Sequence, residues 1–266
     1  MPFFSIIIPT FNSEKDISRC FLSILSQTFK DYEIIVEDGL STDETLTIVT
    51  QIKNSNLVVP IHIYSETDSG IYEAMNKGVR RSSGKWIYFL GSDDVMYDEN
   101  VFQQMFTVCN NSNADVVYGN VLSKKLNGLS GIYDGEFTNE KLFEKNICHQ
   151  AIFMKKIVFN KIGHFNLKYK AHSDWDHNMR WFLSDQISKK HVDIIVSKYS
   201  DDGFSSTYGD SIFEKDKVLK YLILSRSKLK LTVKLKMISS LTGYALLIKD
   251  YNLIGRIIFY SPLILF

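Results

Sequence analysis

The sequence predicts an α/β protein with a mostly parallel, doubly wound sheet. Over the first 120 residues, strand-like runs alternate with helical patterns, which is the rhythm of parallel strands joined by crossover helices. The runs are apolar throughout instead of alternating, as expected for strands covered on both faces. Polar residues follow the runs, and in such sheets ligands bind beyond the carboxyl ends of the strands.

The elements of this part follow one another in a regular order. Residues 4–8 form a β-branched run that Pro9 ends, and Ser13 suits the N-cap of a helix to about residue 27. Ser41 or Thr42 is expected to cap a second helix ending near residue 53. The other strands are expected at residues 32–36, 58–64, 85–90 and 114–118, and a short helix at residues 71–79.

The later chain has a different character, which divides the sequence into residues 1–120, 121–210 and 211–266. The middle part combines glycines, short apolar runs and isolated charges, which indicates a lobe of hairpins and short helices over the binding edge of the sheet. The last part reads as helical to its end. We find no internal repeat and no flexible linker.

Composition narrows the class of protein. The 266 residues are enough for a packed core, and the net charge of +1 gives no reason to expect a nucleic-acid partner. Cys20, Cys109 and Cys148 are widely spaced and odd in number, which suits a reducing compartment and indicates neither a disulfide framework nor a zinc site. No leader pattern precedes the first strand, and no run reaches the roughly 18 apolar residues of a spanning helix. We therefore expect a cytosolic protein.

The residues Gly91-Ser92-Asp93-Asp94-Val95 carry the sharpest chemical signal. They follow the apolar run at residues 86–90. Two adjacent carboxylates at the end of a buried strand repel each other and lose solvation, and Mg²⁺ or Mn²⁺ relieves both costs. The alternative is a solvated turn that caps the next helix.

Polar groups also follow the other strands, so that all of them would share one rim of a parallel sheet. Each group alone is ordinary turn chemistry, and their recurrence is the stronger signal. The groups are Pro9-Thr10-Phe11-Asn12, Asp38-Gly39-Leu40-Ser41-Thr42-Asp43, Glu66-Thr67-Asp68-Ser69-Gly70 and Ser92-Asp93-Asp94.

These segments resemble the family 2 glycosyltransferases, in particular bacterial members of surface-polysaccharide biosynthesis. Four blocks carry the resemblance, at residues 5–12, 33–43, 69–78 and 89–94. It is tight over about residues 3–120 and loose over 145–205, and it does not identify the sugar.

The resemblance implies a GT-A fold and transfer of a sugar, with inversion, from a nucleotide diphosphate to a hydroxyl. Such a reaction needs a bound nucleobase, a divalent cation against the leaving diphosphate and a base on the opposite face. We expect a UDP-hexose donor, with glucose or galactose as the guess, and Mn²⁺ or Mg²⁺. The expected acceptor is a polyprenyl-diphosphate-linked saccharide at the inner face of the cell membrane, in O-antigen or capsule biosynthesis.

The same resemblance assigns the donor contacts. Asp38 would accept from a uracil N–H, with Thr10 and the backbone at Pro9 lining the pocket; its alternative role is to cap the next helix. Asn76 also suits a structural role, and Lys77 a solvated surface. The expected nucleotide-sugar contacts are Pro9, Thr10, Asn12, Asp38, Asp68, Asn76, Lys77, Ser92 and Asp94.

Two departures from the family pattern accompany the metal and base positions. Asp93 takes the metal-contacting place of the Asp-X-Asp block, where Gly91 replaces an acid that the family often has. Asp174 matches the catalytic base, and Ser173 before it replaces the usual Glu. The alternatives are that Asp174 is a helix N-cap or that Asp176 is the base.

The acceptor side is expected to involve two further residues. His149, in Cys148-His149-Gln150, resembles a block placed near the acceptor, although a lone His is more often structural. Arg180 follows Asp174 by six positions. It is expected to contact the acceptor, to pair with an acid or to hold the helix in place.

The C-terminal part bears on location. Basic residues interleave with Leu and Val between Arg226 and Lys236, and residues 253–266 are apolar apart from Arg256. This pattern is typical of a surface drawn to anionic lipid. The alternative is a basic solvated face whose apolar side packs on the core.

Two other functions compete with a glycosyltransferase. A nucleotidyltransferase would be expected to carry a Gly-rich, basic phosphate loop near the N-terminus, where this chain has Pro9-Thr10-Phe11-Asn12. A catalytically impaired nucleotide-sugar-binding protein is compatible with Gly91 and Ser173.

Overall fold

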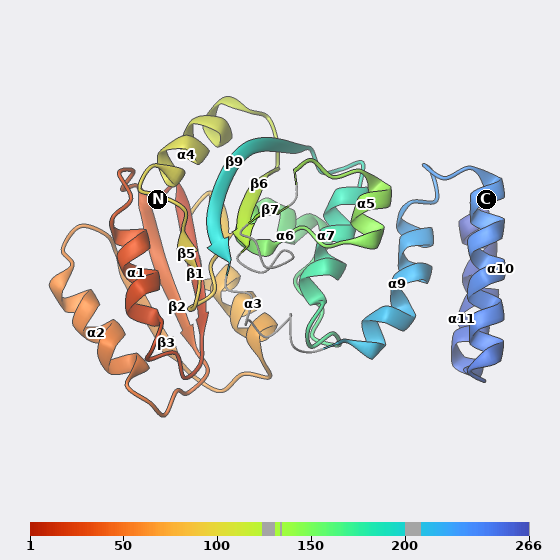
Figure 1. Cartoon of the computed structure of the whole chain (residues 1–266), viewed down its shortest axis with the longest axis horizontal. Helices are drawn as coiled ribbons and strands as arrows, with labels where there is room; N and C mark the ends of the chain where they lie inside the picture. Colours follow the sequence, from red (N-terminus) through yellow and green to blue (C-terminus); the bar gives the residue numbers. More distant parts are fainter. Residues whose placement is uncertain (124–130, 134, 200–208, 266) are drawn as a thin grey trace.

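The structure is a computed structural model that describes residues 1–123, 131–133, 135–199 and 209–265. Its described strands form one curled sheet with helices on both faces and a helical extension at the C-terminal side (Figure 1). This confirms the predicted α/β class with a mostly parallel sheet and C-terminal helices.

Four parallel strands form the first half of the sheet, in the order β3 (Ile61–Ser65), β2 (Tyr32–Asp38), β1 (Phe4–Thr10) and β4 (Trp86–Phe89). β1 and β2 are buried at every position, which explains their continuous apolar sequence. The strand predicted at residues 58–64 begins only at Ile61, directly after Pro60, whose missing N–H disfavours a ladder position.

The second half of the sheet mixes strand directions. β8 (Ile152–Lys155) runs antiparallel to both β4 and β6 (Val116–Ser123), and β9 (Lys189–Tyr199) runs parallel to β6. The short strands β5 (Val95–Met96) and β7 (Gly131–Tyr133) pair antiparallel with β9 and β6. The expected boundary at residue 120 therefore runs through β6, and the middle part of the chain contributes strands to the same sheet.

Successive residues of β1 point to opposite layers. Ile6 and Ile8 belong to a core with Phe21 of α1 (Ile17–Leu25) and Phe102 of α4 (Val101–Asn111), and α2 (Thr45–Ser55) packs in the same layer. Ile7 belongs to the other core. That layer is built from α3 (Ile71–Arg81), α5 (Asn139–Glu144), α6 (Ile157–Ile162) and α7 (Ser173–Leu183).

Helix starts lie later than expected at two places. α1 begins after Asp16 instead of Ser13, and α2 begins after Glu44 instead of Ser41 or Thr42. In both loops the polar side chains are used to tie one loop to the other, as described below, so the caps that their residue types suggest do not form.

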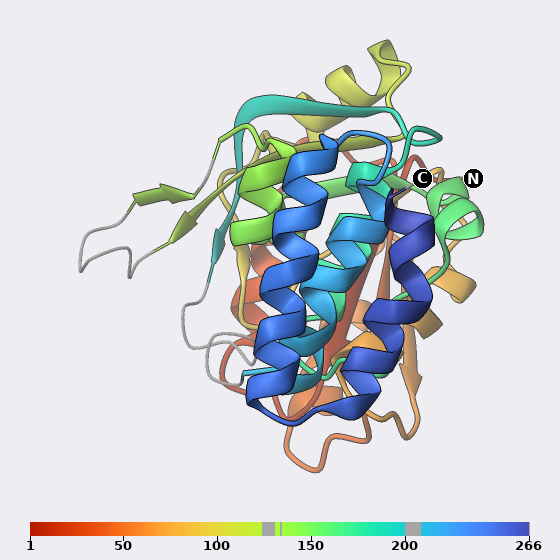
Figure 2. The same cartoon turned by 90° about the vertical axis from the view of Figure 1, so that its right-hand side faces the viewer.

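Three helices close the chain: α9 (Ser211–Leu224), α10 (Leu231–Leu247) and α11 (Tyr251–Leu265). α10 and α11 pack side by side at the end of the molecule farthest from β3, with α9 between them and α7 (Figures 1 and 2). Among the described residues, no helix combines the length and apolarity that crossing a bilayer requires.

Candidate active site

The loops that follow β1 and β2 are tied to each other through Asn12 and Ser41. The amide oxygen of Asn12 accepts from the backbone N–H of Thr42 at 2.9 Å, and the Ser41 hydroxyl accepts from the backbone N–H of Asn12 at 2.8 Å. Asn12 adopts a φ of +47°, a left-handed conformation that Asn tolerates better than most residues. These contacts fix the shape of the rim at the end of the first two strands.

Asp38 ends β2 with its side chain buried. Its carboxylate accepts from the hydroxyls of Ser41 at 2.5 Å and Ser65 at 2.7 Å. Thr10 is its partner in register on β1, and Pro9 precedes Thr10 there. The residues predicted to line a nucleobase pocket are therefore adjacent, and Asp38 caps no helix, because α2 begins after Glu44.

Asp68 lies against the turn that follows β2. A Cβ on Gly39 would lie only 2.9 Å from Asp68 Oδ2, so glycine is what lets the two segments approach. The carboxylate also accepts from the backbone N–H of Gly70 at 2.9 Å. Burial, partly offset by that bond, raises the pKa of Asp68. The structure thus brings together the polar groups that follow β2 and β3.

Asn76 and Lys77 of α3 contact other parts of the chain. Both ends of the Asn76 amide bond the backbone of Phe165, each at 2.9 Å, so the side chain clamps α3 to a later loop. The Lys77 ammonium lies 3.0 Å from the Glu66 carboxylate and donates to the Thr67 carbonyl at 2.6 Å. These contacts occupy the groups that were expected to meet the nucleotide sugar.

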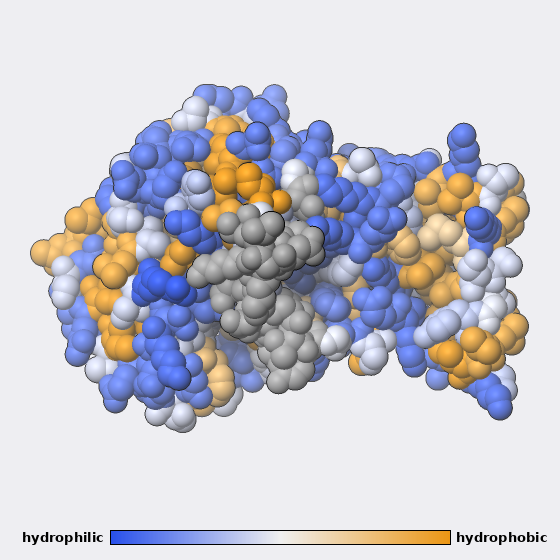
Figure 3. Space-filling view, in the orientation of Figure 1, coloured by the Kyte–Doolittle hydropathy of each residue, from blue (hydrophilic) through white to orange (hydrophobic). Residues whose placement is uncertain are grey.

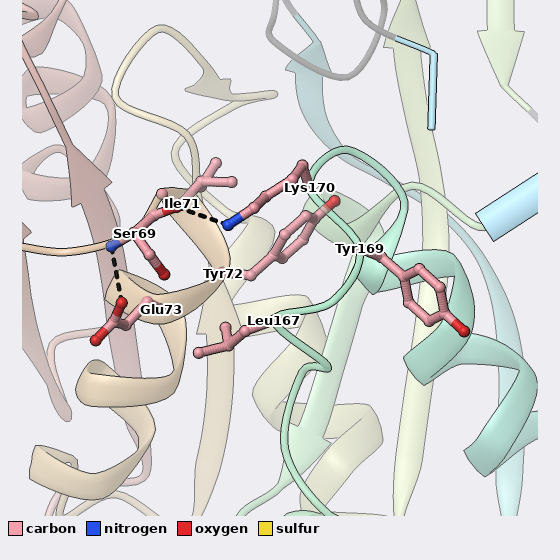
Figure 4. Close-up of a pocket in the computed structure, with 8 residues that line it drawn as sticks. Ser69, Ile71, Tyr72, Glu73, Leu167, Tyr169 and Lys170 are labelled. Atoms are coloured by element: carbon pink, nitrogen blue, oxygen red, sulfur yellow. Dashed lines mark hydrogen bonds between the residues drawn. The ribbon is translucent and has the colours of Figure 1, made fainter. Parts of the chain in front are cut away.

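A narrow seam separates the start of α3 from residues 167–170 (Figure 4). Lys170 reaches the Ser69 carbonyl at 3.4 Å, and Glu73 accepts from the backbone N–H of Ser69 at 2.7 Å. The seam encloses about 10 Å³, which is the space of one water molecule. It therefore fastens two segments and is too small for a substrate.

The acidic loop after β4 folds its carboxylates back over Gly91. A Cβ at this position would lie 2.7 Å from Asp94 Oδ2 and 2.9 Å from Asp93 Oδ1, which gives a physical reason for the missing acid. The Ser92 hydroxyl is 2.7 Å from that of Ser13, and Arg19 donates to the Asp93 carbonyl at 2.9 Å. The loop is therefore anchored to the loop after β1 and to α1.

The donor set for a metal ion is small. Among the described residues, no group of three or more His, Cys, Asp or Glu side chains is arranged to hold a metal. Asp93 and Asp94 offer carboxylate oxygens on neighbouring residues. Such a set fits Mg²⁺ or Mn²⁺ bound through one or two carboxylates while diphosphate oxygens provide other ligands.

Asp174 lies in the first turn of α7 with a side chain only 8% exposed. The Tyr72 hydroxyl is 2.8 Å from its Oδ1, and Asn146 donates to its Oδ2 at 2.9 Å. His149 Nδ1 is 3.6 Å from Oδ2. Burial opposes ionisation, but His149 and Tyr72 outweigh it, so the pKa of Asp174 is lowered. The N-cap of α7 is His172, so Asp174 is not the cap.

A single helical turn, η2 (His149–Ala151), connects this carboxylate to the acidic loop. Gln150 donates to Asp94 Oδ2 at 2.6 Å, while the preceding His149 approaches Asp174. The Gln150 carbonyl accepts from the buried Tyr88 hydroxyl at 3.0 Å, which fixes the turn on β4. The predicted metal motif and the predicted base are therefore each contacted by one residue of the same turn.

His149 has an unusual feature. Its Nε2 atom is buried and has no hydrogen-bond partner within the described part of the chain. A buried polar atom without a partner is costly and calls for an explanation such as a ligand. The unpaired Nε2 atom is consistent with the expected contact between His149 and the acceptor.

Arg180 and Asp176 are committed to each other. Arg180 Nε bonds Asp176 at 3.0 Å, and its other nitrogens donate to the carbonyls of Ile162 and His164. Asp176 also pairs with Lys220. Arg180 therefore holds α7 in place instead of offering a free cation to an acceptor, and Asp176 is a structural acid. Ser173 bonds the Asn166 carbonyl at 2.9 Å.

Sequence reasoning missed Tyr72, Asn146 and Gln150. Tyr72 and Gln150 lie inside blocks that were recognised for other residues. No pattern in the sequence marks Asn146, although Asn178, one helical turn after Asp174, bonds its amide oxygen at 2.9 Å. An Asp and an Asn four positions apart lie on the same helix face. This spacing in α7 is the sequence signal that could have indicated a shared polar partner.

The chain matches the model of "Glycosyl transferase family 2" over residues 5–179. A "PGL/p-HBAD biosynthesis glycosyltransferase" of Mycobacterium bovis (strain BCG / Pasteur 1173P2) is 39% identical over 217 residues, which is 80% of this chain and 83% of the relative. The "GalNAc(5)-diNAcBac-PP-undecaprenol beta-1,3-glucosyltransferase" of Campylobacter jejuni is 31% identical over 136 residues, 51% of this chain and 43% of the relative.

Solved structures share the fold. TarS 1-349 of S. aureus in complex with UDP-GlcNAc superposes with a TM-score of 0.68 at 19% identity, over 91% of this chain and 72% of that one. The mannosyltransferase PcManGT from Pyrobaculum calidifontis, in complex with GDP-Man and Mn²⁺, has a TM-score of 0.64 at 13% identity, over 100% and 81%. The chain has the GT-A architecture and belongs to glycosyl transferase family 2.

Proposed function

We propose that the chain is an inverting, metal-dependent hexosyltransferase that moves glucose or galactose from a UDP-sugar to a hydroxyl of a lipid-diphosphate-linked saccharide. One observation carries the proposal. Asp94 and Asp174 are reached by the consecutive residues Gln150 and His149. A donor diphosphate at the acidic loop and an acceptor at Asp174 would therefore meet at one turn.

The donor is held at the rim formed by β1 and β2. Asp38 accepts one hydroxyl at each oxygen and the Ser41 backbone N–H at Oδ2, which leaves Oδ1, with Thr10 beside Asp38, able to accept from a uracil N–H. Asp68 is adjacent, where a ribose follows the base. The complex of TarS with UDP-GlcNAc supports a UDP-sugar for this fold.

Asp93 would hold the divalent cation against the diphosphate, and Asp94 beside it would contact the sugar. When bound, Mn²⁺ or Mg²⁺ supplies Lewis-acid neutralisation of the leaving UDP. The Gln150 amide orients Asp94 at 2.6 Å, and Arg19 fixes the Asp93 backbone at 2.9 Å. The complex of PcManGT with GDP-Man and Mn²⁺ supports the use of a divalent metal by this fold.

Asp174 takes the proton of the acceptor hydroxyl. The acceptor oxygen then forms a bond to the anomeric carbon from the face opposite the leaving diphosphate, whose bond to that carbon breaks, so the configuration inverts. Tyr72 and Asn146 hold the carboxylate by hydrogen bonds at 2.8 and 2.9 Å. The unpaired Nε2 of His149 is available for an acceptor group.

The C-terminal helices support a place at the inner membrane surface. α10 exposes Leu231, Leu235 and Leu247 at 55%, 49% and 80%, and α11 exposes Phe259 at 75%. Apolar patches cover much of this end of the molecule in Figure 3. With the basic residues at 226–236, they form a surface that suits an anionic bilayer. The named undecaprenol substrate of the Campylobacter jejuni relative fits the same location and a role in O-antigen or capsule biosynthesis.

UDP release tests the proposal, with a panel of UDP-hexoses, a synthetic lipid-diphosphate acceptor, and Mn²⁺ present or chelated. Asp174→Asn is expected to bind the donor normally and to lose transfer by roughly 10²–10⁴-fold. Asp185→Asn, at an exposed ion pair with Lys228, is the matched control. Transfer at the wild-type rate by Asp174→Asn would refute the assignment of the base, and donor binding without transfer by the wild type would favour the impaired binding protein.

A further inference from the structure

A second concave surface lies beside the candidate active site. It is a groove of about 850 Å³ between α5, α9 and α10, within the range of roughly 300–1,000 Å³ typical of ligand pockets. Phe143, Val218, Leu229, Val233 and Met237 are among its apolar lining residues. An apolar groove of this size suits a hydrocarbon chain better than a sugar.

The groove shares a wall with the candidate active site. The carbonyl of Leu142, in α5, accepts from the Trp175 indole at 2.8 Å, and Trp175 directly follows Asp174. Asn146, two residues beyond α5, donates to Asp174. Phe143 follows Leu142 in α5. The centre of its ring is 4.7 Å from that of Tyr221, and both residues line the groove. One short helix therefore contacts the neighbourhood of the base on one side and lines the groove on the other.

Lys217 lies where the two sites approach each other. Its ammonium is 3.7 Å from the centre of the Trp175 ring and 5.4 Å from that of Phe143. Among the described residues it forms no ion pair. Burial lowers its pKa, and the nearby Glu214 carboxylate partly offsets that effect. A half-buried ammonium that no carboxylate contacts directly is suited to an anion such as phosphate.

The rim of the groove is nearly balanced in charge. Its charged lining residues are Glu140, Glu144, Glu214, Lys215 and Lys236. The rim therefore gives no net attraction to an anionic lipid surface, and burial of apolar area on the floor is the main contribution that the groove can make to binding.

We propose that this groove holds the hydrocarbon chain of a lipid-linked acceptor, with the sugar end of the same molecule at Asp174. This deepens the proposed function and rests on it. The continuity of α5 with both sites favours this occupant, because an acceptor that has a sugar and an apolar chain would use both sides of that helix.

The test compares two acceptors with the same saccharide head, one on a short soluble linker and one on a long chain. Each buried methylene contributes up to about fourfold in affinity, so the long-chain acceptor is expected to have a KM at least tenfold lower. Val233→Asp and Ser240→Trp, which make the groove polar or fill it, should raise that KM at least tenfold. Both should leave kcat/KM for the short acceptor within about twofold.

Ser239→Asp is the matched control, because Ser239 is exposed on the same helix and does not line the groove. Leu235→Asp reports separately on the proposed membrane surface. Equal KM values for the two acceptors, or groove variants that behave like Ser239→Asp, would overturn the proposal. An effect seen only on vesicles and shared by Leu235→Asp would assign the surface to the bilayer. If the wild type has the mass of a dimer in solution and the groove variants have that of a monomer, the groove instead binds a second copy of the chain.

A separate experiment tests whether Lys217 recognises the phosphate groups of the acceptor. Lys217→Gln should raise the KM of a long-chain diphosphate acceptor about tenfold and leave that of a phosphate-free glycolipid unchanged. Equal effects on the two would exclude phosphate recognition by Lys217. Equilibrium titration of the long-chain lipids separates lipid binding by the groove from the proposed sugar transfer. Chain-dependent binding without turnover would support the groove and contradict the proposed reaction. Turnover without chain dependence would support the reaction and contradict the groove.

Discussion

The surroundings of Asp174 decide which protonation state the folded chain favours. Tyr72, Asn146 and the backbone N–H of Trp175 all bond the carboxylate, at 2.8, 2.9 and 2.8 Å. Hydrogen bonds to the charged form lower the pKa of an acid. Because a base must be ionised before it accepts a proton, these donors keep the carboxylate ready at neutral pH.

Tyr72→Phe is expected to shift the acid limb of the pH profile of kcat/KM upward. The substitution removes a hydrogen bond that stabilises ionised Asp174, so the pKa of this carboxyl rises. The base is then protonated over a wider acid range, and activity falls first at low pH. Steady-state kinetics from pH 4 to pH 9 give the measurement. Tyr64→Phe, at a partly exposed ring, serves as the control, and an acid limb that does not move in Tyr72→Phe would contradict this role.

At the scale of elements, the position of α3 depends on how closely it approaches β1. A Cβ on Gly78 would lie 2.4 Å from Ile7 Cγ2, so any side chain there pushes the helix off the sheet. The same helix carries Tyr72 to Asp174 and bonds Phe165 through Asn76. Close helix–sheet packing therefore brings Tyr72 to Asp174, the proposed base.

Gly78→Ala is expected to destabilise the chain by about 1–3 kcal/mol through overpacking and to reduce transfer. Gly243, in α10, has open space around it, and Gly243→Ala should stabilise its helix by about 0.5–1 kcal/mol. Urea unfolding of the two variants provides the comparison. Equal stabilities for both would show that the tight packing at Gly78 is unimportant.

Much of the first half of the fold can be predicted from the sequence, because β1, β2 and β4 are buried on both faces and therefore carry continuous apolar runs. The strands of the second half cannot be ordered in this way, since β8 and β6 pair antiparallel through contacts between distant segments. Helix starts are missed where Asn12 and Ser41 bond across loops.

The candidate site shows the same division. The positions of Asp38, Asp93 and Asp174 follow from motifs at strand ends and at a helix start. The partners of Asp174 do not, because Asn146 and Tyr72 reach it across 28 and 102 positions of sequence. The contacts of Lys77 and Arg180 with neighbouring carboxylates and carbonyls also join distant segments, and the sequence left open whether these side chains meet a ligand or the protein.

At the scale of the whole molecule, the C-terminal helices are joined to the body through Asp216 of α9. Its carboxylate bonds Lys168 at 2.8 Å, Tyr169 at 2.6 Å and Arg256 of α11 at 2.5 Å. Leu229 and Met237 pack against the core that contains Ile7 and also against the core formed by α9, α10 and α11. Asp216, the ion pairs Lys220–Asp176 and Lys228–Asp185, and these apolar contacts thus connect the end that we propose faces the membrane to the rest of the chain.

The Asp216 network predicts loss of stability in acid. Burial opposes ionisation, but Lys168, Tyr169 and Arg256 lower the pKa of Asp216 from 3.8 to about 2. A depressed pKa stabilises the fold at pH values above the unfolded value, and this contribution is lost as the pH falls through the folded one. Stability should therefore decline between about pH 4 and pH 2. Asp216→Asn should reduce that slope in denaturant titrations, and an unchanged slope would refute the role of the network.

The central claim is that one cleft holds a cation and a diphosphate at Asp93 while Asp174 approaches the acceptor from the other side. A crystal structure with a UDP-hexose and Mn²⁺, with the metal located by anomalous scattering, tests it most directly. The account predicts a manganese peak beside Asp93, in contact with the diphosphate, and the sugar between that peak and Asp174. A nucleotide bound away from Asp38 and Asp93, or a sugar that Asp174 cannot reach, would contradict it.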